Sequence, residues 1–346
     1  MKTSLLDLSF EEVEKIVVEL GQQKFRAKQI YDFAFSGVQI EDMTSLSKDL
    51  RNKISSNYVS NPVEISKKLS SKDTYKYIFN LQDGNIIEGV LMKHSYGNTI
   101  CVSTQVGCRM GCKFCASGLN GLVRNLFASE ILGQVLAVNR DLGGNRENRK
   151  ITNIVLMGSG EPLDNYDEVV KFLKLVNAPY CLNISQRNIS LSTCGLADKI
   201  RKLADDGFSI TLTISLHAPT DELRKTIMPI ANAFSLKEVV DASKYYFEKT
   251  GRRVVFEYSM IKGVNDSFDC AQKLKNLLKG FPTHVNLSPL NPVEERGLAG
   301  TEKHAVYAFL KKLEENGQSA TVRRSMGQEI EGACGQLRNK ILKEKK

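Results

Sequence analysis

Residues 101–118 have the sequence CVSTQVGCRMGCKFCASG, and three of their cysteines set the rest of the interpretation. Cys108, Cys112 and Cys115 follow a C-x3-C-x2-C spacing, so their thiolates can converge on one metal centre. A four-iron cubane ordinarily takes four cysteines, so three would leave one iron open to a small molecule. Structural zinc is the alternative, but zinc usually takes two paired Cys/His units across a longer gap, and the sequence has no second pair. We therefore predict an iron–sulfur cluster on these three residues.

Downstream of the cysteines, strand-like and helix-like stretches alternate. Strands separated by helices of this length imply a parallel sheet built from βα units. About six such units predict an α/β fold with a partial (β/α)6 barrel, whose chemistry would lie at the carboxyl ends of the strands. We expect strands at 151–158, 188–193, 209–216, 253–261, 284–290 and 319–324, and helices at 166–177, 196–206, 235–249, 268–279 and 301–316.

Upstream of the cysteines, the pattern divides into two smaller parts. Residues 1–58 are expected to form a helical module, because Ser9 and Glu12 have capping-box spacing before an apolar-periodic stretch. Residues 59–97 are expected to form a β-rich connecting segment, with the dipeptide Asp83-Gly84 as a hairpin turn. The core would then occupy residues 98–340, and residues 340–346 would form a basic tail.

The composition excludes some protein classes but does not identify a partner. The net charge of +9 comes from 48 Lys and Arg against 39 Asp and Glu. A solvated basic surface explains this charge as well as a polyanionic partner such as RNA does. The N-terminus lacks the pattern of a secretory signal, and no apolar run approaches the ~18 residues of a membrane helix, so we expect a soluble cytoplasmic protein. Eight cysteines without an export signal favour metal binding or chemistry over disulfides.

Small polar residues follow the predicted strands, where a barrel would bind a ligand. The segment GSGEP, residues 158–162, follows the first strand after the cysteines. Its glycines let the backbone approach a ligand, and Glu161 can accept a hydrogen bond from an ammonium group. A plain strand-to-helix turn is the alternative for so short a motif. The other strand ends supply Ser192, Ser215, Leu216, His217 and Asn291, each of which alone could be an ordinary turn or structural residue.

The cysteine triplet, with Phe114 before its last member, resembles the radical S-adenosylmethionine (SAM) superfamily. In that superfamily the amino and carboxylate groups of SAM chelate the open iron of a [4Fe–4S] cluster, and one electron cleaves SAM to a 5′-deoxyadenosyl radical. GSGEP is similar to the superfamily's GGEP-type motif, which implies that Gly160 and Glu161 bind SAM. We assign the other strand-end residues to the same cofactor site.

A narrower resemblance covers nearly the whole chain. Four stretches resemble, in this order, those of the RlmN/Cfr family of radical-SAM RNA methyltransferases: FRAKQIYDFAF, SLHAPTDELRKTIMPI, GVNDS and VRRSMGQEIEGACGQL. The resemblance implies methylation at C2 of adenine 2503 in 23S rRNA and of adenine 37 in tRNA, and an N-terminal RNA-binding domain. It also implies two SAM molecules per turnover and an electron donor such as flavodoxin or ferredoxin. We expect a monomer.

The chemistry gives roles to two further cysteines. C2 of adenine is electron-poor, so direct methyl transfer from SAM is unattractive. The resemblance implies that Cys334 takes a methyl group from one SAM, and that the radical from a second SAM abstracts hydrogen from it before the carbon adds to C2. Cys101 would then attack the sulfur of Cys334 to form a transient disulfide, and Glu88 would accept the proton at C2. The remaining cysteines, Cys181, Cys194 and Cys270, fit small buried hydrophobic residues.

Alternatives stay open for the reaction and for the class of protein. Cfr-type enzymes methylate C8 of the same rRNA adenine with the same residues, although they typically carry alanine where this chain has Pro162. Ser159 stands where many relatives carry methionine, but both flanking glycines are retained. A radical-SAM activase acting on a protein, or a non-catalytic iron–sulfur RNA-binding module, would not need the pair Cys101 and Cys334.

Overall fold

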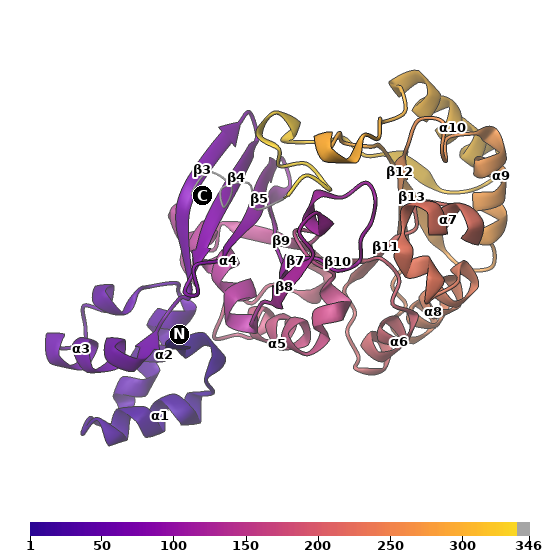
Figure 1. Cartoon of the computed structure of the whole chain (residues 1–346). Helices are drawn as coiled ribbons and strands as arrows, with labels where there is room; N and C mark the ends of the chain where they lie inside the picture. The colour runs from indigo at the N-terminus through magenta and orange to yellow at the C-terminus, as the bar shows by residue number, and fades with distance from the viewer. Residues whose placement is uncertain (338–346) are drawn as a thin grey trace.

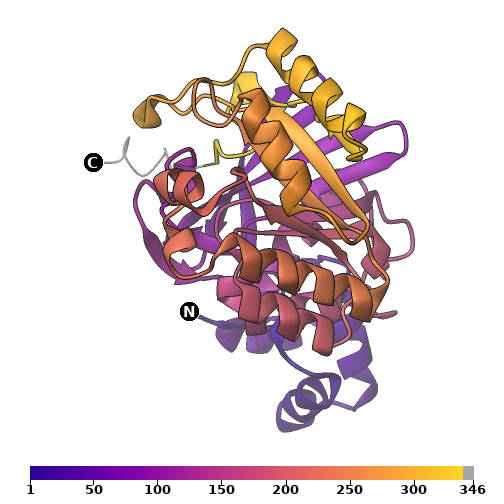
Figure 2. The same cartoon turned by 90° about the vertical axis from the view of Figure 1, so that its right-hand side faces the viewer.

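The computed structural model describes residues 1–337, so the predicted basic tail at 340–346 lies outside the described residues. Its largest element is a ten-stranded sheet with the order β14-β13-β12-β11-β10-β9-β6-β5-β4-β3. The sheet curves, and the helices of the core pack along its outer side (Figures 1 and 2). Because β14 and β3 are the two ends of this order, the barrel stays open, and the predicted partial α/β barrel is confirmed.

Seven strands of the sheet are parallel, and six strand–helix units connect them. Apolar side chains such as Leu191 and Phe256 are fully buried against the helices. Alternate residues such as Ser192 and Glu257 face the inside of the barrel, as the two-residue period of a strand requires. The strands are β6 Gly97–Cys101, β9 Ile151–Leu156, β10 Ile189–Thr193, β11 Thr211–Ser215, β12 Val254–Met260, β13 Thr283–Pro289 and β14 Ala320–Val322.

The helices of the core follow these strands in turn. The predicted helices are present, and their ends have recognisable signals: α8 begins at the capping box of Ser235 and Glu238 and ends at Gly251, whose φ is 66°. Two further helices, α4 and α7, were not expected from the sequence. The helices are α4 Ala128–Asp141, α5 Tyr166–Asn177, α6 Ala197–Asp205, α7 Asp221–Ile227, α8 Leu236–Thr250, α9 Phe268–Leu277 and α10 Lys303–Glu315.

The β-rich segment 59–97 continues the same sheet. Its strands β3 Val63–Ser71, β4 Thr74–Leu81 and β5 Ile86–His94 pair antiparallel, and β5 pairs antiparallel with β6. Asp83 and Gly84 form the turn between β4 and β5, where Asp83 Oδ1 accepts a hydrogen bond from Asn85 N at 3.0 Å. The segment therefore widens one wall of the barrel.

The N-terminal residues form a helical module at one end of the core (Figure 1). It contains α1 Phe10–Glu19, α2 Phe25–Phe35 and α3 Lys48–Asn57, and the capping box of Ser9 and Glu12 is present. Ion pairs tie it to the core, including Lys171 Nζ to Asp7 Oδ1 at 3.1 Å and Arg146 Nη1 to Asp32 Oδ1 at 2.7 Å. Within residues 1–337, no helix is both long enough and apolar enough to span a bilayer.

Candidate active site

A cavity of about 220 Å³ lies at the carboxyl ends of the parallel strands. We call it the thiol cavity, because five cysteines named as site residues line it. Two other predicted site residues, Glu88 and Leu216, are not part of its lining. The predicted residues that line it are Cys101, Cys108, Cys112, Cys115, Gly160, Glu161, Ser192, Ser215, His217, Asn291 and Cys334.

One side of the thiol cavity is the loop that carries the cysteine triplet. This loop lies between β7 Gln105–Gly107 and β8 Leu122–Asn125, which pair as a short antiparallel hairpin. Gly107 has a φ of 78°, and a Cβ there would lie 2.0 Å from Gly121 O, so only glycine fits. Burial raises the pKa of the Cys108 thiol to about 12 and also raises that of Cys112, with the neighbouring thiols adding to the effect.

The donor set of this loop fits an iron–sulfur cluster better than a single ion. Within residues 1–337, no three His, Cys, Asp or Glu side chains converge closely enough to chelate one ion. In a four-iron cluster each cysteine binds a different iron, so the three sulfurs stand apart and need not meet. Such a cluster would be held by the three thiols of Cys108, Cys112 and Cys115, which lie on one loop and line one cavity.

The GSGEP segment lies beside the triplet. Gly160 has a φ of 108°, and a Cβ there would lie 2.8 Å from Gln105 N, so the backbone packs directly on the strand that enters the cysteine loop. Glu161 is fully buried, and its carboxylate accepts hydrogen bonds from Cys194 N at 2.7 Å and Leu163 N at 3.0 Å. Burial raises the pKa of Glu161, although these backbone donors oppose the shift. The carboxylate is thus fixed, and it faces a cavity in which a cation would stabilise its charged form.

The ends of β10 and β11 add hydroxyl groups and an imidazole. The hydroxyls of Ser192 and Ser215 lie 3.2 Å apart on adjacent strands. His217 has a left-handed φ of 57°, and its Nδ1 accepts a hydrogen bond from Ser259 N at 3.0 Å, so Nε2 carries the proton. Burial lowers the pKa of His217 to about 3, so the ring is neutral, and it packs edge-on against Phe114 of the cysteine loop.

Leu216 is buried outside the cavity, so its side chain cannot contact a ligand there. Its carbonyl oxygen instead accepts a hydrogen bond from Arg224 Nε at 3.2 Å. Arg224 is fully buried and also donates to Cys194 O at 2.5 Å, which fixes the ends of β10 and β11 to each other. Sequence reasoning missed Arg224, because it lies among the charged residues of the stretch DELRKTI and nothing in the sequence marks it as buried.

The opposite side of the thiol cavity holds the second pair of thiols. Cys101 is buried at the end of β6, whereas Cys334 is exposed on the C-terminal segment. Burial, and then the neighbouring Cys334, raise the pKa of Cys101 to about 12. Arg323 lies close to both thiols, and they and Glu257 raise its pKa; it donates a hydrogen bond to Glu257 Oε1 at 3.1 Å. Arg323 was not predicted as a site residue either.

The C-terminal segment, residues 327–337, crosses the mouth of the thiol cavity. Asn291 donates from Nδ2 to Cys334 O at 3.0 Å and accepts from Gln328 Nε2 at 2.6 Å. Further hydrogen bonds tie the segment to the core: Ala116 N donates to Gly335 O, Ser117 Oγ donates to Leu337 O, and Gln336 Nε2 donates to Pro292 O. Asn291 therefore holds the segment at Cys334 as well as lining the cavity.

Glu88 lies beneath this segment and not in the cavity. Its carboxylate forms an ion pair with Lys76 at 2.8 Å, and both side chains are about 95% buried. Lys76 also donates to Glu331 O at 3.2 Å. To contact a base bound in the cavity, Glu88 would need residues 327–337 to move.

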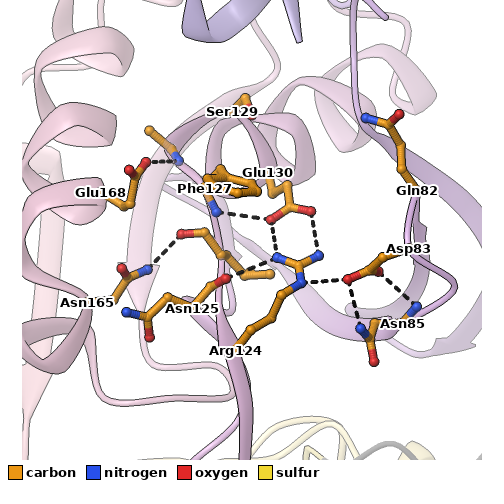
Figure 3. Close-up of polar contacts among 12 residues, drawn as sticks. Gln82, Asp83, Asn85, Arg124, Asn125, Phe127, Ser129, Glu130, Asn165 and Glu168 are labelled. Carbon is orange, nitrogen blue, oxygen red and sulfur yellow. Dashed lines mark hydrogen bonds and ion pairs between the residues drawn. The ribbon is translucent and has the colours of Figure 1, made fainter. Parts of the chain in front are cut away.

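A charged network anchors the far end of the cysteine hairpin. Figure 3 shows Arg124 of β8 held between Asp83, in the turn of β4 and β5, and Glu130 at the start of α4. Its guanidinium makes two hydrogen bonds to Glu130, at 2.7 and 2.8 Å, and one to Asp83 at 2.6 Å. Burial opposes ionisation of Asp83, but the hydrogen bonds from Arg124 and Asn85 outweigh it and lower the pKa of Asp83 to about 2. The network fixes the loop's exit strand to two other parts of the fold.

Known proteins share both the sequence and the fold of this chain. A family model described as "Radical SAM superfamily" matches residues 102–269, and one described as "Ribosomal RNA large subunit methyltransferase N-terminal domain" matches residues 3–59. The "Probable dual-specificity RNA methyltransferase RlmN" of Clostridium perfringens (strain SM101 / Type A) is 54% identical over 346 residues, covering 99% of this chain and 98% of that protein.

Two further relatives extend the comparison. The protein of the same name from Lachnospira eligens is 50% identical over 348 residues, covering 99% of this chain and 97% of that protein. The crystal structure of a radical SAM methyltransferase from Sphaerobacter thermophilus superposes with a TM-score of 0.92 at 39% identity, covering 97% of this chain and 99% of that one.

Proposed function

The chain belongs to the RlmN family of radical-SAM RNA methyltransferases, and we propose that it methylates C2 of adenine 2503 in 23S rRNA and of adenine 37 in tRNA. Membership of the family implies SAM and a [4Fe–4S] cluster as cofactors. The observation that carries the finer proposal is the position of Cys101 and Cys334. Both line the same cavity as the Cys108, Cys112 and Cys115 triplet, as a thiol-carried methyl group requires.

The residues on one side of the thiol cavity would bind the cluster and SAM, and the two thiols on the other side would carry out methyl transfer. Cys108, Cys112 and Cys115 would hold the cluster, whose one-electron chemistry would generate the 5′-deoxyadenosyl radical from SAM and would accept the electron that the adenine adduct gives up. Glu161 would accept hydrogen bonds from the ammonium group of SAM, and Gly160 lets the ligand approach the backbone. Ser192, Ser215, His217 and Asn291 line the remaining surface that SAM would contact.

Cys334 would carry the methyl group. Its thiolate displaces S-adenosylhomocysteine from one SAM, so an S–CH3 bond forms as the sulfonium bond breaks. The radical from a second SAM removes one hydrogen atom from this group, and the resulting carbon radical adds to C2. Glu88 would take the C2 proton once residues 327–337 have moved.

Cys101 would complete the turnover. Its thiolate attacks the sulfur of Cys334, the S–S bond forms, and the bond from that sulfur to the new methyl carbon breaks. The released carbon takes a proton, and an external thiol then reduces the disulfide. A donor such as flavodoxin or ferredoxin would supply the electron for SAM cleavage. The N-terminal module would contribute to RNA binding, and its exposed Phe25, with Arg26 4.9 Å from the ring centroid, offers a surface for this.

Product analysis tests the proposal directly. The reconstituted protein would be incubated without oxygen with SAM, dithionite and a 23S rRNA fragment, and the digested nucleosides identified by mass spectrometry. We expect 2-methyladenosine together with 5′-deoxyadenosine. 8-Methyladenosine in place of 2-methyladenosine would assign Cfr-type chemistry, and 5′-deoxyadenosine without a methylated base would overturn the substrate assignment.

A further inference from the structure

A second cavity lies beside the thiol cavity and extends toward the amino ends of β9 and β10. We call it the amino-end cavity; its volume is about 640 Å³, within the range of sites that bind small molecules, about 300–1,000 Å³. The turn between β5 and β6 forms one side, and residues 187–190 form another. It shares part of its lining with the thiol cavity, namely Met92, Val155, Arg323, Arg324 and Met326.

The side chains around the amino-end cavity combine flat rings with positive charge. His94 and Tyr96 stack with ring centroids 4.7 Å apart and an interplanar angle of 7°, and Tyr96 is 71% exposed. Lys93, Arg187 and Arg324 also line the cavity, and Asp73 is the only acidic residue among the described residues that line it. An exposed ring that already stacks on another ring is a platform for a further planar group.

The amino-end cavity meets the thiol cavity on the side of the two catalytic thiols. Cys101 packs with Val90 and Leu337, and the partly buried Met92 and Val155 pack against that cluster. Met92 and Val155 also line the amino-end cavity. A molecule that occupies it therefore lies across a thin apolar wall from Cys101, and away from the triplet.

An RNA substrate is the occupant that this chemistry favours. An adenine modified on its ring must leave its stack to reach the enzyme, so its neighbouring nucleotides are pulled toward the same opening. Single-stranded RNA is bound by aromatic rings that stack on bases and by cations that contact phosphates. A basic rim alone would suit an acidic protein equally well, but a hollow with a stacked aromatic pair suits a planar base.

We propose that the amino-end cavity binds a nucleotide adjacent to the methylated adenine, with its base on Tyr96 and its phosphates near Lys93, Arg187 and Arg324. This proposal rests on the proposed RNA methyltransferase function. It gives the RNA a path to the thiols from the amino ends of the strands. SAM, held at the carboxyl ends, would then approach the same thiols from the other side.

The test measures RNA affinity with the reconstituted full-length protein. The probe is a fluorescein-labelled 23S rRNA hairpin with the target adenine in its loop, followed by fluorescence anisotropy. We expect Tyr96→Ala to raise Kd about 5- to 150-fold, the range for one lost stacked base. Arg187→Gln should weaken binding and lower the slope of log K against log salt by about 0.7, the value for one phosphate contact with a single strand.

Matched controls separate this effect from misfolding and from charge in general. Tyr96→Phe keeps the ring and should bind like the wild type. Tyr307→Ala removes a tyrosine of comparable type, 49% exposed on α10, and Lys311→Gln removes a cation on the same helix; neither should change Kd. Thermal melting would establish that the Tyr96 and Arg187 variants are folded.

Two results would overturn the proposal, and they are distinguishable. If the wild type methylates the hairpin but Tyr96→Ala and Arg187→Gln bind it unchanged, the amino-end cavity is not the subsite. If the wild type neither binds nor methylates the hairpin, the proposed function itself fails.

Discussion

One side of the thiol cavity carries Cys108, Cys112 and Cys115 on a loop anchored by buried charged groups, whereas the other carries Cys334 on a segment attached mainly by single neutral hydrogen bonds. The loop is fixed through Arg124 and Glu130 at its exit strand and through Gln105 at its entry strand, where Gln105 accepts from Glu161 N at 2.9 Å. Residues 327–337 depend on bonds such as Asn291 to Cys334 O. Each neutral bond contributes about 1 kcal/mol, whereas breaking a buried ion pair costs about 3–5 kcal/mol. The cysteine loop is therefore held more firmly than residues 327–337, and displacing this segment would allow Cys334 to meet both SAM and RNA, as the proposed reaction requires.

The largest loss of activity is expected from a substitution on the cysteine loop. Cys112→Ala should abolish cluster assembly and all turnover, because two thiols on the loop cannot replace three cluster ligands. The visible absorbance of the reconstituted protein and the yield of 5′-deoxyadenosine measure this. Cys270→Ala is the matched control, since Cys270 is buried on α9 away from both cavities. A Cys112→Ala protein with the full iron–sulfur absorbance would contradict the cluster assignment.

Removing the thiol of Cys334, on the segment 327–337, should abolish methyl transfer but not SAM cleavage. Cys334→Ala should yield no methylated adenine but should still cleave SAM, because the cysteine loop is intact. Mass spectrometry of the digested RNA and of the small molecules measures the two products in one sample. Methylated RNA from Cys334→Ala would rule out the thiol carrier, and loss of SAM cleavage would mean that the two sides are not independent.

A third variant, at Glu161 beside the cysteine loop, tests the proposed SAM site. Glu161→Gln keeps an oxygen to accept from Cys194 N but removes the negative charge that faces the cavity. We expect SAM affinity to fall about 10- to 100-fold, the effect of losing one hydrogen bond to a charged group. Isothermal titration calorimetry on the reconstituted protein measures it, with the exposed Glu302→Gln as control. Unchanged affinity would remove Glu161 from the SAM site.

The rate of the final thiol step should depend on pH. Burial, and then Cys334, raise the pKa of Cys101 to about 12, so the thiol is protonated at neutral pH and its thiolate fraction grows about tenfold per pH unit. Disulfide formation in a single turnover should therefore accelerate between pH 7 and pH 9. Rapid quenching with alkylation of free thiols measures the rate, and Arg323→Met should slow it at every pH by removing a nearby positive charge. A rate independent of pH would show that Cys101 deprotonation does not limit this step.

The sequence predicted the parts of the fold that have strong local signals. The order of βα units and the N-terminal capping box could be found because amphipathic helices and caps depend on nearby residues. Helix α4 was missed although its apolar residues recur at helical spacing, and its polar residues Glu130 and Gln134 are buried through hydrogen bonds that the sequence alone does not show. The other helix that was missed, α7, spans only seven residues, too few for a reliable period.

Site residues could be predicted from the sequence only where they belong to a recognisable sequence motif. The structure brings the triplet, Gly160, Glu161, Cys101 and Cys334 to one cavity, although they come from segments more than 200 residues apart. It leaves Leu216 and Glu88 outside that cavity, because strand register and the course of residues 327–337 decide which side chains face it. Arg224 and Arg323 could not be singled out, since their importance comes from partners that are distant in the sequence.

The smallest expected effects are changes in stability, and they test directly whether the cysteine loop is held more firmly than residues 327–337. Arg124→Met should lower the free energy of unfolding by about 3 kcal/mol, because it leaves the buried carboxylate of Glu130 without its partner. Gln328→Ala removes one neutral bond to Asn291, so it should cost about 1 kcal/mol or less overall. Its effect should instead be local: hydrogen exchange of residues 327–335 should speed up about 5-fold, while exchange in β7 and β8 stays unchanged. If Gln328→Ala destabilised the whole chain as much as Arg124→Met, the segment that carries Cys334 would be as rigidly fixed as the cysteine loop, and a thiol that moves between SAM and RNA would need another hinge.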